Sequence, residues 1–180
     1  MIIWKRVMSI RVDMDSFIFV TFLMAMVVTV TNFNYTVMAQ TEAREKLTAE
    51  LSGQNEVPPT NSLATGFADF EIIGRDSIQY NLNATSIENV TAGHLHGGLE
   101  GQNGPILVQL FSYDAPVNQV SETGTITENN PAFLSGTVTS QQQLHDFMTA
   151  MRKGQIYVNI HTEQNPDGEI RGQITTNDGS

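Results

Sequence analysis

Hydrophobic and polar residues alternate along most of the chain after residue 46, and turn-forming residues separate the alternating stretches. The segment 65–73 is a clear example, because the acidic Asp69 and Glu71 separate its apolar residues. A period of two residues is typical of strands that bury one face. Further strands are predicted at 47–51, 78–82, 104–111, 124–127, 135–140, 155–161 and 169–176. This succession of short strands predicts an all-β fold, an antiparallel Greek-key β-sandwich or barrel.

One segment follows a helical period instead. Apolar residues recur at intervals of three and four between positions 144 and 151, which places them on one stripe of a helix. Ser140 and Gln143 form the pattern of a capping box at the start of this segment, and Gly154 stands where a helix would end. The sequence therefore predicts one short helix within the β-fold.

The N-terminal part has a different composition from the rest of the chain. Residues 17–30 are free of charge, basic residues precede them, and a small-residue pattern that loosely fits a cleavage site ends at Ala39. This is typical of a signal peptide, and an uncleaved membrane anchor is the alternative. Either interpretation predicts an exported protein, extracellular or at the cell surface. The predicted organisation is a signal or anchor at 1–39, a short linker at 40–46, one domain at 47–176 and a tail at 177–180.

Charge and cysteine content exclude several classes of function. The formal net charge is −10, and no basic patch or tail is present to neutralise phosphates, so nucleic acid is not an expected partner. The chain has no cysteine, which excludes disulfides, thiolate nucleophiles and cysteine-based metal sites. A membrane is expected as a partner only through residues 1–39, if they are not cleaved. Sequons at Asn83 and Asn89 leave glycosylation open.

The segment TAGHLHGG at 91–98 holds two of the four histidines of the chain. In a strand, residues i and i+2 point to the same face about 6.5–7 Å apart, so His94 and His96 would project together and Leu95 would face the core. His161 ends another predicted strand. Three neutral imidazoles suit copper, with zinc as an alternative. The other interpretation of these histidines is that they organise turns and bind nothing.

Residues close to His161 in the sequence are expected to surround such an ion. Asn159 and Tyr157 share its strand face and should line the same pocket. The carboxylates of Glu163, Asp167 and Glu169 are near His161 in the sequence and can accept an imidazole N–H. Arg171 should point away from the core, and a salt bridge to a neighbouring glutamate is its alternative role. The residues predicted to surround the ion are Asn159, Glu163, Glu169 and Arg171.

Three blocks of the sequence resemble the conserved blocks of the CHRD domain. They are LSGQNEVPP at 51–59, AGHLHGG with GQNGPILVQLF between 92 and 111, and YVNIHTEQNPDGEIRGQI at 157–174. This module was first described in chordin and occurs in many secreted proteins of bacteria and archaea. The resemblance covers about residues 46–175 and implies an extracellular β-domain. It does not imply growth-factor binding, since no other chordin module accompanies it.

A weaker resemblance is to the copper/zinc superoxide dismutases, which are Greek-key β-sandwiches. His94 and His96 match the paired copper ligands of that pattern, and His161 matches the copper ligand near the C-terminus. Arg171 stands where the anion-steering arginine would be. The loop after GQNGPILVQLF has no bridging histidine, and the zinc loop and the disulfide are absent. The comparison therefore leaves a mononuclear copper site and puts a full dismutase site in doubt.

These patterns lead to one functional hypothesis and two alternatives. The leading one is an exported CHRD domain that binds a transition metal, copper before zinc, through His94, His96 and His161. The first alternative is a non-enzymatic structural or protein-interaction module of the cell envelope, with other envelope proteins as partners. Dismutase-like redox activity is the weaker alternative. No set of catalytic residues stands out, so an enzyme is not the expected class.

Overall fold

The structure is a computed structural model that describes residues 43–128 and 140–176. The predicted signal or anchor at 1–39, the tail at 177–180 and nearly all of the predicted strand at 135–140 lie outside the described residues. In the described part of the chain, no helix is both long and apolar enough to cross a membrane.

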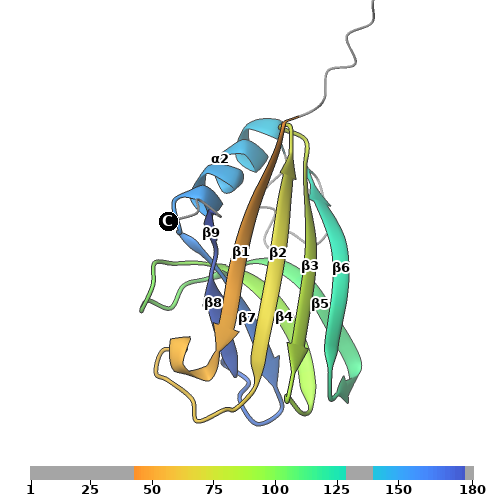
Figure 1. Cartoon of the computed structure of the whole chain (residues 1–180), viewed down its shortest axis with the longest axis vertical. Coiled ribbons are helices and arrows are strands. Elements are labelled where there is room, and N and C mark those ends of the chain that lie inside the picture. The colour runs from red at the N-terminus through yellow and green to blue at the C-terminus, as the bar shows by residue number, and fades with distance from the viewer. Residues whose placement is uncertain (1–42, 129–139, 177–180) are drawn as a thin grey trace, which may run out of the picture. The chain divides into compact units, whose positions relative to one another are not determined.

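The described residues form a nine-stranded antiparallel sheet (Figure 1). The order of its strands is β5-β4-β7-β8-β1-β2-β3-β6, and β9 pairs with β1. A short 3-10 helix, Gly53–Asn55, follows β1. The all-β prediction is therefore confirmed. The strands are β1 (Arg44–Ser52), β2 (Thr65–Ile73), β3 (Ser77–Thr85), β4 (Val90–Gly97), β5 (Ile106–Val117), β6 (Val120–Thr127), β7 (Ile156–Thr162), β8 (Ile170–Gln173) and β9 (Thr175–Thr176).

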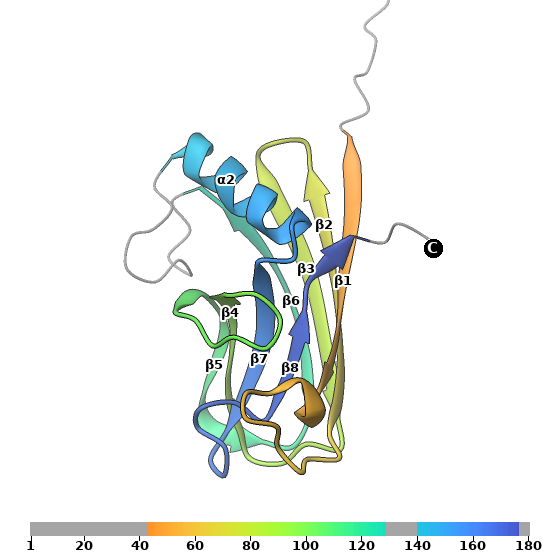
Figure 2. The ribbon, with the colours of Figure 1, turned by 90° about the vertical axis from the view of Figure 1, so that its left-hand side faces the viewer.

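The sheet curls into two layers that nearly close into a barrel (Figures 1 and 2). Strands β1, β2, β3 and β6 form one layer, and β5, β4, β7 and β8 form the other. Side chains connect β5, at one end of the sheet, to β6 and β3 at the other. The hydroxyl of Tyr113 on β5 donates to Glu122 on β6 at 2.6 Å, and Tyr80 on β3 donates to the Leu110 carbonyl of β5 at 2.9 Å. These contacts hold the layers together without a further strand pairing.

The core lies between the layers and is built from the apolar face of each strand. Leu47 of β1 is opposite Phe70 of β2, and both are almost fully buried. Leu95 of β4 is opposite Val158 of β7, and neither is exposed. Burying a side chain of this size contributes about 1.5–3 kcal/mol. Because alternate residues face opposite ways, this register leaves the other face of β4, β7 and β8 free for polar side chains.

The predicted helix is present as α2 (Gln141–Arg152), which packs on the sheet at one end of the layers (Figure 2). Ser140 caps it by accepting the N–H of Gln143 at 3.3 Å, as the sequence predicts. Gly154 follows with a φ of +63°, a conformation that glycine adopts without strain. The buried stripe of α2 consists of the predicted residues, Leu144, Phe147, Met148 and Met151.

Several element boundaries differ from the prediction; β5, for example, is Ile106–Val117 where 104–111 was predicted. Strand β1 begins at Arg44, so the end of the predicted linker at 40–46 belongs to the sheet; there Arg44 pairs with Glu71 at 2.9 Å. The predicted strand at 169–176 is interrupted at Ile174, whose N–H donates to the Ile156 carbonyl. The chain beyond Ile174 leaves β7 and pairs with β1 as β9.

Candidate metal centre

The register of β4 and β7 brings the three histidines together. Ala92 is opposite His161, and His94 is opposite Asn159. Cross-strand partners share a face of the sheet, with Cβ atoms about 4.5–5.5 Å apart. His94, His96 and His161 therefore project from the same face, opposite to Leu95.

The three imidazoles form a compact cluster. One ring nitrogen of each histidine lies within 4.8 Å of the corresponding nitrogens of the others. The ring centroids are 4.7 Å apart for His94 and His161, 5.6 Å for His96 and His161, and 5.8 Å for His94 and His96. Nitrogen ligands bind zinc at about 2.0–2.1 Å, so their mutual separations around one ion are roughly 3–4 Å. A small contraction of the cluster reaches that geometry.

Backbone carbonyls fix which nitrogen of two of these rings carries the proton. His96 Nδ1 lies 3.0 Å from the Gly104 carbonyl, and His161 Nδ1 lies 2.9 Å from the Pro166 carbonyl. A carbonyl only accepts hydrogen bonds, so each Nδ1 is the donor and each Nε2 keeps its lone pair. Both Nε2 atoms are buried without a hydrogen-bond partner, and so is Nδ1 of His94. Buried polar atoms without partners are rare, and three of them belong to this cluster.

The loop at 98–105 reaches the cluster because of one close backbone approach. A Cβ on Gly104 would collide with the carbonyl of Gly97, so only glycine allows the loop to lie against the end of β4. The Gly97 N–H donates to the Pro105 carbonyl at 3.0 Å and holds this contact. The Gly104 carbonyl thereby comes within reach of His96.

Burial keeps the histidines in their neutral form. Desolvation lowers the pKa of His94 to about 4, and the nearby His161 and His96 lower it further in the same direction. Burial also lowers the pKa of His96 and of His161. A metal binds the neutral imidazole, so the cluster is in its ligand form at neutral pH.

Tyr157 and Arg171 pack beside the cluster. The Tyr157 ring stacks on His96 with centroids 5.0 Å apart, and the Arg171 guanidinium lies 3.5 Å from the centroid of the Tyr157 ring. Arg171 is only 2% exposed and donates to the Leu99 carbonyl at 3.0 Å and to Asn103 at 3.3 Å. It points away from the core, as predicted, and Gln173 is a further acceptor at 3.5 Å. Among the described residues, no glutamate forms a salt bridge with it.

The carboxylates that the sequence suggested as imidazole partners are not the acceptors of His96 and His161. Glu163 and Asp167 are exposed; burial lowers the pKa of His161, and the charge of Asp167 partly opposes this effect. Glu169 is buried and accepts hydrogen bonds from Ser62, Thr162 and Asn165, so it organises the 162–169 turn. These three donors lower its pKa, although burial acts against them as the largest single effect. Backbone carbonyls take the place that was predicted for carboxylates at His96 and His161.

Glu56 is a buried residue near the cluster that no sequence motif marks. This glutamate is 6% exposed and lies in the loop after β1, where Asn159 Nδ2 donates to its Oε2 at 3.5 Å. Burial raises its pKa to about 7 against the opposing effects of Arg171, its own loop backbone and Asn159. The one available signal was its position inside the LSGQNEVPP block, which carries no indication of burial.

The family model that matches the chain is that of the CHRD domain, over residues 47–174. The chain belongs to the CHRD domain family. All three histidines of the cluster, together with Glu56 and Arg171, fall inside the matched region. A search of curated proteins gives no match.

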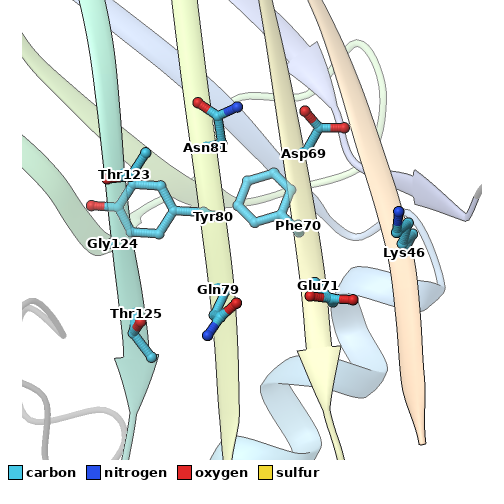
Figure 3. Close-up of a pocket in the computed structure, with 10 residues that line it drawn as sticks. All are labelled: Lys46, Asp69, Phe70, Glu71, Gln79, Tyr80, Asn81, Thr123, Gly124 and Thr125. Atoms are coloured by element: carbon cyan, nitrogen blue, oxygen red, sulfur yellow. The ribbon is translucent and has the colours of Figure 1, made fainter.

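The CHRD domain also has a hollow of about 600 Å³ on its other layer (Figure 3). Its lining comes from β1, β2, β3 and β6 and contains no histidine, so it is separate from the cluster on β4 and β7. Its lining residues are Lys46, Asp69, Phe70, Glu71, Gln79, Tyr80, Asn81, Thr123, Gly124 and Thr125.

Proposed function

We propose that this CHRD domain binds one transition-metal ion, copper or in second place zinc, through His94, His96 and His161. The observation that carries the proposal is the set of three buried ring nitrogens, all without hydrogen-bond partners, in one cluster. Two of the rings are already oriented by carbonyls at Nδ1, which is how proteins commonly hold metal-binding histidines.

The ligand set favours copper. Imidazole suits copper and zinc, and copper binds a given nitrogen site more tightly than the other divalent metals of its row. Three protein ligands leave a further coordination position, through which a bound ion supplies Lewis-acid or redox chemistry. The protein's own contribution is to keep the imidazoles neutral, oriented and largely shielded from water. We assign the domain to metal binding and delivery outside the cell, in line with the predicted export segment.

Calorimetric titration of the purified protein with Cu²⁺ and with Zn²⁺ tests the proposal. The expected result is one ion per chain, with affinity reduced at least about 100-fold in His94→Ala, His96→Ala and His161→Ala. His145→Ala is the matched control, because His145 lies on α2 outside the cluster and its loss should leave the affinity unchanged. Binding that the three cluster substitutions do not weaken would contradict the proposal.

One observation favours a second candidate, an interaction module without a metal. The bonds from His96 to Gly104 and from His161 to Pro166 tie two loops to the sheet, which is a structural role in itself. In that case the histidine variants would lose thermal stability, and the wild-type protein would show no specific uptake of either ion. The same titration therefore separates the two candidates.

A further inference from the structure

Glu56 lies one side chain away from the histidine cluster. Its carboxyl contacts Asn159, and Asn159 is the direct cross-strand partner of His94 on β7. Asn159 is also opposite Arg171 on β8, so the row His94, Asn159, Arg171 crosses three strands with Glu56 packed on its middle member. The residues that this row brings together come from four separate segments of the chain.

A proton on the carboxyl would complete the hydrogen bonds of this pair. Asn159 Nδ2 donates to Glu56 Oε2 at 3.5 Å, while Glu56 Oε1 and Asn159 Oδ1 are both buried without a partner. Both of these oxygens face Gly168, where a Cβ would come within 2.7 Å of each. An ionised carboxylate and an amide oxygen only accept, so neither can satisfy the other. A protonated Oε1 would be able to donate to Oδ1, which would give a two-bond acid–amide pair.

We infer that Glu56 is held as a neutral carboxylic acid paired with Asn159, and that it releases its proton when a divalent cation occupies the histidine cluster. Glu56 is thus a positioning residue that sets the charge of the site. The release step rests on the proposed metal binding, whereas the neutral acid does not.

The charge of a bound ion supplies the reason for the release. Without an ion, the histidines are neutral, and Arg171, which packs on Tyr157 beside them, is a buried cation of the site. A divalent ion adds two positive charges with neutral ligands, and a nearby positive charge favours the ionised form of a carboxyl. Ionised Glu56 then offsets part of the added charge.

The other charged groups around Glu56 do not reverse this balance. Arg171 from β8 attracts the ionised form, yet burial outweighs it and raises the pKa of Glu56 to about 7. Glu100 lines a small hollow with Glu56 and Arg171, and Asp167 and Glu169 line another with Glu56. All three are acidic, so none of them stabilises the ionised form of Glu56.

The released proton has a direct way out of the protein. Glu56 lines a hollow of about 650 Å³ between its own loop and the 164–169 turn, and this hollow is open to solvent. The step is a simple exchange: the O–H bond of Glu56 breaks, its electron pair stays on the carboxylate, and the proton leaves to water. No oxidation state changes.

The neutral acid is tested in the metal-free protein by infrared difference spectroscopy. At about pH 6, below the pKa of about 7, the wild type should show a neutral carboxylic C=O band that is absent from Glu56→Gln. Gln keeps the pair, because its amide donates to Asn159 and accepts in return. Glu163→Gln, an exposed glutamate nearby, is the control and should keep the band. A wild-type spectrum without it would overturn the inference.

Proton release is tested by titrating Zn²⁺ calorimetrically in buffers of different ionisation enthalpy. At about pH 6 the wild type should release about one proton more than Glu56→Gln, and the difference should vanish at about pH 8, where Glu56 is already ionised. Zn²⁺ binding with equal proton release in both proteins would overturn the inference and leave the proposed function intact. Absence of Zn²⁺ and Cu²⁺ binding would overturn the proposed function and the release step, and the infrared band would still decide the neutral acid.

Discussion

His96 and Tyr157 face each other across β4 and β7, and their rings stack with an interplanar angle of 16°. The Tyr157 hydroxyl also accepts the Gly104 N–H at 3.2 Å, next to the carbonyl that orients His96. Tyr157 therefore fixes the His96 ring both by contact and through the loop.

Removing the Tyr157 ring should weaken metal binding. Tyr157→Leu is expected to lower the Zn²⁺ affinity about 10-fold, because residues that orient a ligand typically contribute that much. Tyr157→Phe keeps the stack and loses one hydrogen bond, so its affinity should lie between those of the wild type and Tyr157→Leu. Equal affinities in all three proteins, measured by chelator competition, would show that the stack does not hold His96.

Gly104→Ala should destabilise the protein by about 1–3 kcal/mol, because the added Cβ displaces the Gly97 carbonyl and with it the support of His96. Urea denaturation of the metal-free protein measures the change. Gln102→Ala in the same loop is exposed and should remain within about 0.5 kcal/mol of the wild type. Comparable losses in the two variants would mean that the close approach at Gly104 is not the cause.

Acidification should destabilise the metal-free protein through His94. Its folded-state pKa of about 4 lies below the ordinary histidine value of 6.5, so between these values the unfolded chain binds more protons than the folded one. Stability should fall as the pH decreases from about 6.5 towards 4. Glu56 has the opposite sign, since its raised pKa removes stability as the pH rises from 4.5 through about 7.

The His94 effect is therefore best measured in a Glu56→Gln background by thermal denaturation across this pH range. Adding His94→Ala should flatten the remaining pH dependence in part, because His96 and His161 contribute in the same direction. A slope that His94→Ala leaves unchanged would be inconsistent with a buried neutral imidazole at this position.

Arg171→Lys should loosen the loop at 98–105. Lysine keeps the charge but loses the planar fork that reaches Leu99 and Asn103 and the flat contact with Tyr157. Hydrogen exchange of the loop amides should become faster. Arg152→Lys is the control: Arg152 forms a partly exposed ion pair with Glu45, and such pairs contribute only about 0–1 kcal/mol. Unchanged hydrogen exchange in Arg171→Lys would show that Arg171 does not anchor the loop at 98–105.

Local sequence patterns predicted much of this fold because their causes are local. The alternation in 65–73 corresponds to β2 without a shift of boundary, and the cap at Ser140 begins α2 as expected. The spacing of His94 and His96 placed both on one strand face and Leu95 in the core. His161 lies beside them because β7 is the neighbour of β4 in the sheet. The sequence predicted that the three histidines meet, but it did not predict this strand order.

The remaining features depend on contacts between distant segments. The partners of His96 and His161 are carbonyls of loops, and no side-chain pattern marks a carbonyl. Glu56 is buried because its loop packs against Asn159 and Gly168, far along the chain. A single acidic residue in a turn-rich segment is ordinarily exposed, so its burial could not be deduced from the sequence.

Electron paramagnetic resonance of the protein loaded with one equivalent of Cu²⁺ tests the metal centre itself. We expect a single copper species whose hyperfine structure reports the three imidazole nitrogens of the cluster. His161→Ala should reduce that pattern, and His145→Ala should leave it as in the wild type. A spectrum that is the same in the wild type and His161→Ala, or one typical of unbound copper, would contradict the metal centre.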